Sequence, residues 1–210
     1  MCEKQSGKHI NARSYALVKR LSDIVLSGVG LIILSPLLLC LWAAVRMTSP
    51  GPALFKQKRV GQGGILFQML KFRTMRLDTP SETPTHLLQD PYAYITKIGR
   101  FLRKTSLDEL PQLWNILVGD MSIIGPRPAL WNQDDLIAAR EQNGANQIRP
   151  GLTGLAQVMG RDELPIEVKA AYDGEYRQKM SFLFDCQIFC RTIHMVISAK
   201  GVSEGGQKSS

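Results

Sequence analysis

The amino-acid sequence predicts an α/β fold that is mostly helical, with a small β-hairpin and an N-terminal membrane helix. Residues 24–45 contain twenty-two amino acids and no charge, and about twenty such residues suffice to span a bilayer as a helix. Residues 54–75 contain two short apolar–polar alternations joined by glycines, a pattern that is typical of a hairpin. The later apolar residues recur mostly at helical spacing, which indicates helices around the hairpin.

The composition describes a single basic domain. The chain has 210 residues, enough for one domain with its own core. Its formal net charge of +8 comes from 26 lysines and arginines against 18 acidic residues, and fits anionic partners such as nucleic acid, an anionic membrane surface or phosphorylated substrates. Histidines and cysteines show no zinc-site spacing. Because Cys40 lies in an apolar run, and Cys186 and Cys190 lie four apart on a predicted helix, we expect no disulfide framework and a reducing, cytoplasmic-facing environment.

The apolar segment has basic residues on both sides and a Ser35-Pro36 pair in its middle. Lys19 and Arg20 precede it, and Arg46 follows it. A crossing helix with basic residues at both ends fits the positive-inside rule poorly. Pro36 breaks the helical hydrogen-bond ladder and kinks the helix, and the hydroxyl group of Ser35 can satisfy a freed carbonyl group. We therefore favour a helix that bends at this pair and returns to the same side, over an ordinary kinked transmembrane helix.

These patterns divide the chain into four segments. They are a polar N-terminal tail (1–17), a membrane anchor broken at Ser35-Pro36 (18–47), a larger domain (48–202) and a disordered tail (203–210). Within the domain we expect helices over 134–142, 167–179 and 181–198, turn chemistry at 149–154 and a short strand over 155–161. The last helix has one apolar stripe, which is typical of core packing or, beside an anchor, of a membrane interface; the stripe contains Phe182, Cys186, Phe189, Ile193, Val196 and Ile197.

Two basic residues, Lys71 and Arg73, lie at the end of the second predicted strand. Residues two apart in a strand point to the same face, so we expect both side chains on one side of the hairpin. There they could bind a phosphate group, or they could form a solvated basic edge. The glycines within 61–64 are not followed by a helical pattern, so they indicate a turn and not a nucleotide-binding loop.

An adjacent acidic pair, Asp108-Glu109, begins a predicted helix in the middle of the chain. Ser106 and Glu109 have the spacing of a capping box, although Pro111 favours a regular helix that starts close to Asp108. At a helix start the macrodipole keeps a carboxylate ionised. Neighbouring helix residues point about 100° apart, so the pair does not face a substrate as glycosidase carboxylates do. It suits a nucleophilic aspartate beside an orienting or metal-binding glutamate; the alternative is that it only caps the helix.

Basic residues gather around this acidic pair in the sequence. Arg103 lies shortly before it, and Arg127 follows it between Pro126 and Pro128. The two prolines restrict the backbone and are suited to aim the guanidinium group. Cations that converge on an ionised acid near a helix N-terminus make a site for a phosphate group.

Three motifs together resemble one protein family. They are KFRTM (71–75), RKTSLDELPQLWNILVGDMSIIGPRP (103–128) and RPGLTGLAQVMGR (149–161). They resemble the bacterial sugar transferase family, the monotopic phosphoglycosyl transferases, in the family's order, and the similarity covers about residues 19–202. The resemblance implies a re-entrant membrane helix and an interfacial, cytoplasmic catalytic domain at the bacterial inner membrane.

The resemblance also implies a reaction. A phospho-sugar would pass from a UDP-sugar to polyprenyl phosphate, of the undecaprenyl type, in the inner leaflet, through a covalent intermediate on Asp108 and with release of UMP. Asp108 and Glu109 would hold Mg²⁺, which offsets the repulsion between an anionic nucleophile and a pyrophosphate. The expected phosphate-binding residues are Arg103, Arg127, Arg149, Arg161, Lys71 and Arg73.

The expected partners follow from the same resemblance. It is compatible with a homodimer and with docking of downstream glycosyltransferases of glycan assembly. A rival interpretation is a membrane-tethered adaptor whose basic surface binds anionic lipid or nucleic acid. The acidic pair among cations fits that adaptor poorly, and the sequence has no basic strip interleaved with aromatic residues of the RNA-binding type. We therefore expect an enzyme with no nucleic-acid partner.

Overall fold

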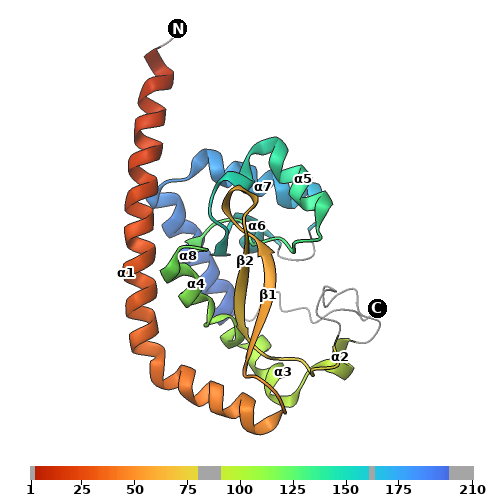
Figure 1. Ribbon diagram of the computed structural model, residues 1–210. Coiled ribbons are helices and arrows are strands. Elements are labelled where there is room, and N and C mark those ends of the chain that lie inside the picture. The colour runs from red at the N-terminus through yellow and green to blue at the C-terminus, as the bar shows by residue number, and fades with distance from the viewer. Residues whose placement is uncertain (1–2, 80–90, 161–163, 199–210) are drawn as a thin grey trace.

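The protein is described by a computed structural model, which covers residues 3–79, 91–160 and 164–198 (Figure 1). The helices are α1 (Glu3–Thr48), α2 (Pro91–Tyr94), α3 (Lys97–Lys104), α4 (Gln112–Val118), α5 (Asp134–Asn143), α6 (Leu155–Met159), α7 (Ile166–Lys179) and α8 (Phe182–Ile197). The strands are β1 (Leu54–Val60), β2 (Leu66–Phe72), β3 (Ser122–Ile124) and β4 (Gly151–Thr153), and short 3₁₀ turns are η1 (Gln62–Gly64), η3 (Leu107–Glu109) and η4 (Ala145–Gln147). The predicted mostly helical α/β class is confirmed. The predicted tail over 203–210 lies outside the described residues.

α1 is one helix that begins at Glu3, so the polar segment predicted as a tail is helical. It bends toward its C-terminal end (Figure 1) and contains Pro36. Ser35 Oγ donates a hydrogen bond of 2.8 Å to the carbonyl oxygen of Ile32, the group left without a helical partner because Pro36 has no N–H. The expected hydrogen bond from Ser35 to the freed carbonyl is present, and the re-entrant break at this pair stays a prediction. From Tyr15 to Thr48, α1 is long and apolar enough to cross a membrane.

Polar side chains join the N-terminal half of α1 to the domain. Asp185 of α8 accepts hydrogen bonds from Lys19 Nζ at 2.5 Å and from Tyr15 at 2.6 Å on one oxygen, and from Tyr176 of α7 at 2.7 Å on the other. The buried carboxylate of Asp23 accepts a bond of 3.0 Å from a backbone N–H of β3. We call Tyr15, Lys19, Asp23 and Asp185 the polar seam. Because buried polar groups must be paired, the seam determines where α1 lies on the domain.

α1 contacts the domain at two further places. The guanidinium group of Arg20 donates hydrogen bonds of 2.6 and 2.9 Å to two carbonyl groups in the last turn of α4. Nearer the C-terminal end of α1, Leu41 and Val45 are buried in a core cluster that includes Phe72 of β2 and Leu102 of α3. The same domain is therefore in contact with α1 in its N-terminal half and beyond its bend.

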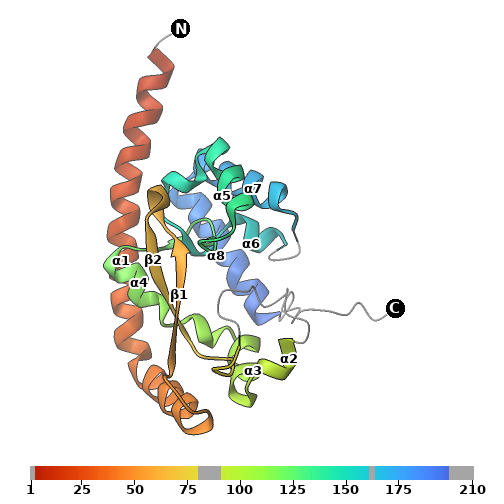
Figure 2. The same cartoon turned by 45° about the vertical axis from the view of Figure 1, so that its right-hand side comes forward.

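β1 and β2 form the predicted antiparallel hairpin, which runs beside α4 (Figure 2). Residues two apart in a strand share a face, and so do residues directly opposite each other. In the observed register Phe55 lies opposite Lys71, so Gln57 and Arg59 share the face that carries Lys71. The hairpin thus brings side chains of its first strand to the side on which Lys71 acts.

A second, parallel sheet of β3 and β4 was not predicted, because the segment around Gly151 reads only as a turn. Two glycines allow its close backbone approach. A Cβ at Gly125 would lie 2.5 Å from the carbonyl oxygen of Arg149, and one at Gly151 would lie 2.1 Å from the nitrogen of Gly125. Hydrogen bonds of 2.8 Å join Gly125 N–H to the carbonyl of Thr153 and Gly151 N–H to the carbonyl of Pro126. These two hydrogen bonds hold Gly125 and Pro126, which are the start of the loop that carries Arg127.

The segment after Gly154 is a helix, α6, so the predicted strand over 155–161 is wrong. Four of its five residues are leucine, alanine, glutamine and methionine, which are good helix formers. The helices predicted over 134–142, 167–179 and 181–198 are confirmed as α5, α7 and α8.

The apolar stripe of α8 is not core. Phe182 is 61% exposed and Phe189 48%, and Cys186 is exposed as well. The opposite side of α8 carries Ile188, which is buried in a cluster with Tyr176. The expectation of core packing for the stripe is wrong, and a place in a membrane interface stays a prediction.

We expect Asp185→Asn to loosen α1 from the domain. The substitution removes the charge that pairs with Lys19 and weakens the bonds from Tyr15 and Tyr176, so the free energy of unfolding should fall by about 2 kcal/mol. For a chain of this length the thermal midpoint should drop by about 4 to 8 °C. Asp78→Asn is the control, since that carboxylate pairs with Arg76 at the surface and should be neutral. Equal midpoints in the two variants would contradict the role of the polar seam.

Candidate active site

Asp108 and Glu109 lie in the 3₁₀ turn η3, and α4 begins only at Gln112, after Pro111. The helix start predicted close to Asp108 is therefore wrong by one turn. The capping box is also wrong, because Ser106 has a φ of 56° and its side chain caps nothing. This left-handed conformation is costly for a residue other than glycine, and such strain is commonly found at functional sites. Ser106 directly precedes the 3₁₀ turn that carries the two carboxylates.

Glu109 is held by two cations. Its Oε1 accepts a hydrogen bond of 2.8 Å from Lys71 Nζ and one of 2.7 Å from Arg127 Nη2. Burial alone would raise the pKa of Glu109, but the charges and hydrogen bonds of Arg127 and Lys71 outweigh it and hold that pKa well below its usual range. Burial lowers the pKa of the Lys71 ammonium group, and Arg127 adds to this lowering while Glu109 opposes it. Glu109 is therefore an ionised group with a fixed orientation.

Asp108 differs from its neighbour. Its side chain is buried, and within the described parts of the chain no donor makes a hydrogen bond to its carboxylate. Burial raises the pKa of Asp108, and the charge of Glu109 adds to this, while Lys71, Arg103 and Arg127 lower it. The macrodipole argument predicted a carboxylate stabilised in its charged form, whereas burial has the larger effect. A carboxylate that is poorly solvated and not hydrogen-bonded is a more reactive nucleophile than one in water.

Arg103 and Arg127 reach the acidic pair from different elements. Arg103 projects from α3, and its Nε donates a hydrogen bond of 2.9 Å to Thr74 Oγ1, just after β2. Arg127 follows Gly125 in the loop after β3 and contacts Glu109. Both were predicted as site residues, and the structure brings them together with Lys71 at Asp108 and Glu109.

The sequence prediction missed two residues that hold this arrangement. Arg59 Nη1 donates a hydrogen bond of 2.9 Å to the carbonyl of Pro128, and β1 also bridges to Leu130. The loop of Arg127 is thereby tied to the hairpin that carries Lys71. Asn115 of α4 is buried and bonds both the N–H of Leu70 and the carbonyl of Gln68 in β2, at 3.0 and 2.9 Å. The alternation in β1 could have indicated Arg59, but nothing local indicates Asn115.

Two predicted phosphate ligands, Arg73 and Arg149, make their hydrogen bonds away from this group. Arg73 follows the end of β2, so the strand alternation no longer holds, and its Nη2 bonds the carbonyl of Ser49 at 2.8 Å. Arg149 donates to the carbonyl of Gly119 at 3.1 Å, near α1. Arg161 lies outside the described residues. The expectation that Lys71 and Arg73 act together is not met, because they contact different elements.

The oxygen atoms of Asp108 and Glu109 could hold Mg²⁺ only if substrate phosphates and water completed its coordination. Within the described ranges no three His, Cys, Asp or Glu side chains gather as a metal site. Both cations on Glu109 use Oε1, which leaves Oε2 and the carboxylate of Asp108 as oxygen ligands. Magnesium is commonly held by one or two carboxylates that substrate phosphates and water complete. The two acids suit such a shared site, and they do not form a closed protein cage.

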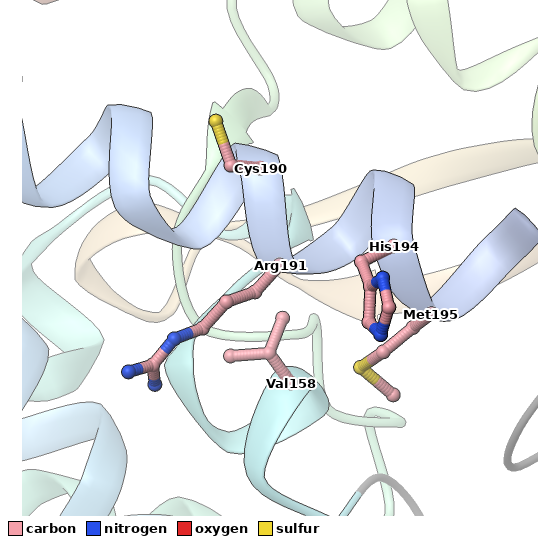
Figure 3. Close-up of a pocket in the computed structure, with 5 residues that line it drawn as sticks. All are labelled: Val158, Cys190, Arg191, His194 and Met195. Atoms are coloured by element: carbon pink, nitrogen blue, oxygen red, sulfur yellow. The ribbon is translucent and has the colours of Figure 1, made fainter. Parts of the chain in front are cut away.

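A cavity of about 460 Å³ lies elsewhere, between α6 and α8 (Figure 3). Val158 of α6 faces Arg191, His194 and Met195 of α8, whereas Cys190 points to the other side of the helix. None of the predicted site residues that the structure describes lines this cavity, so the chemistry is assigned to the group around Asp108.

Comparison with known proteins agrees with this site. A family described as bacterial sugar transferase matches residues 14–199. The chain belongs to the bacterial sugar transferase family. The match includes all three motifs and α1 from Ser14 onward, so the predicted resemblance and the predicted transferase class are confirmed.

Several members of the family are similar in sequence. The UDP-glucose:undecaprenyl-phosphate glucose-1-phosphate transferase of Caulobacter vibrioides is 43% identical over 192 residues, which are 87% of this chain and 70% of that protein. The uncharacterized sugar transferase EpsL of Bacillus subtilis is 38% identical, over 90% of this chain and 91% of its own. The undecaprenyl-phosphate galactose phosphotransferase of Salmonella typhimurium is 37% identical over 90% of this chain, which spans only 42% of that longer protein.

The raised pKa of Asp108 leads to a pH prediction. The nucleophilic role predicted for Asp108 requires an ionised carboxylate, and this form is lost as the pH falls through a pKa above the ordinary 3.8. Because Arg103 lowers that pKa, Arg103→Gln should move the acid limb of kcat/KM upward by about 0.5 to 1 pH unit. Arg103→Lys should restore the limb, and Arg100→Gln, on the exposed side of α3, should leave it in place. A lower activity in Arg103→Gln with an unmoved acid limb would contradict this role.

Proposed function

We propose that the protein is a phosphoglycosyl transferase that moves a phospho-sugar from a UDP-sugar to a polyprenyl phosphate and so begins the assembly of a lipid-linked glycan. The names of its relatives support both substrates. The observation that carries the mechanism is the contrast between the two adjacent acids. Glu109 is fixed by two cations, whereas Asp108 is buried and free of hydrogen bonds from the described residues.

The proposed reaction has two displacements at one phosphorus atom. A carboxylate oxygen of Asp108 attacks the phosphorus that carries the sugar; the bond from this phosphorus to the bridging oxygen breaks, and UMP leaves with that oxygen. An oxygen of the polyprenyl phosphate then attacks the same phosphorus and expels the carboxylate. The product is a polyprenyl diphosphate sugar, and Asp108 is regenerated. Splitting the transfer into two steps allows each substrate to react separately.

The residues around Asp108 have distinct tasks in this proposal. Arg127 and Arg103 bear the phosphate charge, since a guanidinium fork matches phosphate oxygens. Lys71 and Arg127 keep Glu109 ionised and oriented, so that it can hold the metal ion that completes the site. When bound, Mg²⁺ supplies positive charge that offsets the repulsion between the carboxylate and the pyrophosphate.

We also propose that α1 is re-entrant, with both ends on the cytoplasmic side of the inner membrane. The polar seam near Lys19 and the core cluster around Val45 hold the two halves of α1 to one domain. A helix that crosses would carry these two contact regions to opposite sides of the bilayer. The bend of α1 toward its C-terminal end, together with Pro36 inside the helix and Ser35 on the freed carbonyl, agrees with a segment that enters and returns.

Asp108→Asn should lower turnover by about 10⁴-fold or more, because no neighbouring group replaces the nucleophile. Glu109→Gln should lower it by about 10- to 100-fold and raise the Mg²⁺ concentration needed for half-maximal activity. UMP release from a panel of UDP-sugars in the presence of polyprenyl phosphate measures both effects and identifies the sugar. Asp134→Asn, at an exposed position of α5, is the matched control. Near-normal UMP release by Asp108→Asn would exclude the covalent step.

Topology can be tested by labelling with a membrane-impermeant thiol reagent. In a background without native cysteines, single cysteines at residue 5 and residue 205 should both react in inside-out vesicles and neither in spheroplasts. Replacing Ser35 and Pro36 by alanine should restore the helical ladder, worth about 3 kcal/mol of helix preference, and shift some molecules to a spanning topology. Labelling of the two sites from opposite faces in the wild type would exclude the re-entrant helix.

A further inference from the structure

A buried cation lies against the C-terminal end of α1, and the described residues give it no counter-ion. Arg73 is 5% exposed, and only its Nη2 has partners, the carbonyl oxygen and hydroxyl group of Ser49 at 2.8 and 3.2 Å. Its Nε and Nη1 are buried and make no hydrogen bond. A guanidinium group removed from water is costly unless an anion or full hydrogen bonding compensates it. The bonds to Ser49 at the end of α1 satisfy Nη2 of Arg73. They leave Nε and Nη1 buried without a hydrogen-bond acceptor.

A second arginine increases this imbalance. Arg46, in the last turn of α1, is exposed, and its Nη1 donates a bond of 2.7 Å to the carbonyl of Gly51. Burial lowers the pKa of Arg73, and the charge of Arg46 lowers it further. Among the residues that the structure describes, no carboxylate lies within ion-pair distance of either guanidinium, and the nearby Asp78 is engaged with Arg76. Two like charges are thus held together with no acid between them.

The local backbone is built to bring Arg73 to this place. Gly51 has a φ of 105°, and a Cβ there would lie 2.3 Å from Arg73 Nη1. Any other residue at position 51 would displace the guanidinium group. The side chain of Leu77 covers the same edge and is 62% exposed, so it can rotate away without opening a core. The edge of Arg73 that makes no hydrogen bond is therefore separated from solvent only by the side chain of Leu77. The exposed Arg46 lies beside it.

The surroundings indicate which anion is available. Arg46 ends the apolar stretch of α1, and Arg73 contacts Ser49 just beyond that helix. In the same stretch Trp42 and Met47 are 49% and 86% exposed. Arginines at the end of an apolar helix lie at the depth of lipid headgroups, and tryptophan prefers the same interface. At that depth the abundant anion is a phosphate group on a lipid, whose oxygens match a guanidinium fork.

We propose that Arg46 and Arg73, joined by the Gly51 turn, form a second phosphate site, separate from Asp108, which takes the phosphate group of a membrane lipid. The inference rests on α1 lying in a membrane and not on the transfer chemistry. The phosphate has two possible sources, an anionic phospholipid of the bilayer or the polyprenyl phosphate before it reaches Asp108. In either case, binding neutralises the buried charge and stabilises the fold.

The test is thermal unfolding of the full chain in neutral detergent micelles doped with one lipid at a time. Phosphatidylglycerol or polyprenyl phosphate, at about ten times its Kd, should raise the midpoint by about 3 to 6 °C. Diacylglycerol, which has the same type of chains and no phosphate, should leave it unchanged. Arg46→Gln and Arg73→Gln should lose the rise, and Arg76→Gln, an exposed arginine close in sequence, should keep it.

Each outcome of this experiment either supports the second phosphate site or overturns it. A rise with phosphatidylglycerol that depends on Arg46 assigns the site to bilayer phospholipid, and such a rise with polyprenyl phosphate alone assigns it to the acceptor. Equal shifts in the wild type and Arg46→Gln, equal shifts with diacylglycerol, or no shift at all overturn the proposal. Should Arg73→Gln not fold, the exposed Arg46 decides alone. UMP release by the same preparations tests the transferase separately, so failure of one proposal is distinguishable from failure of the other.

Discussion

The two ion pairs on Oε1 of Glu109 hold the site together. Lys71 comes from β2, Arg127 from the loop after β3 and Glu109 from η3, so one oxygen atom joins three parts of the fold. A carboxylate that leaves water can be kept ionised only if cations repay the lost hydration, and here they do so. Asp108, the residue before Glu109, has no ion pair of this kind, and burial raises its pKa. Two adjacent and identically charged groups thereby acquire different chemistry.

The supporting contacts are arranged around that oxygen. Asn115 ties α4 to β2, and Arg59 ties the Arg127 loop to β1. The glycine pair, Gly125 and Gly151, lets the backbones of β3 and β4 approach so closely that the start of this loop cannot shift. These groups touch no predicted reacting atom. They set the positions of the cations, and small errors in such positions are costly for catalysis.

The sequence predicted the elements that depend on local patterns, and it did not predict the contacts between segments that are distant in the chain. The hairpin follows from alternation, and α5, α7 and α8 follow from helical spacing. The grouping of Lys71, Arg103 and Arg127 around the acidic pair was expected from the motifs. The β3–β4 pairing and the left-handed Ser106 have no local signal, because each depends on contacts made across the fold. Arg73 was misplaced for a related reason: β2 ends one residue before it, so the rule that placed it beside Lys71 no longer applied.

α4 connects the anchor to the reacting groups. Arg20 of α1 holds its C-terminal carbonyl groups, and η3 with Asp108 lies just before its N-terminal end. α4 has seven residues, about 10 Å of helix, and so short a helix behaves as a rigid strut. A tilt of α1 would then move α4 and, with it, the turn that carries Asp108. Helices can tilt to match the thickness of the bilayer, so in the membrane setting that we propose, bilayer thickness would also bear on the position of Asp108.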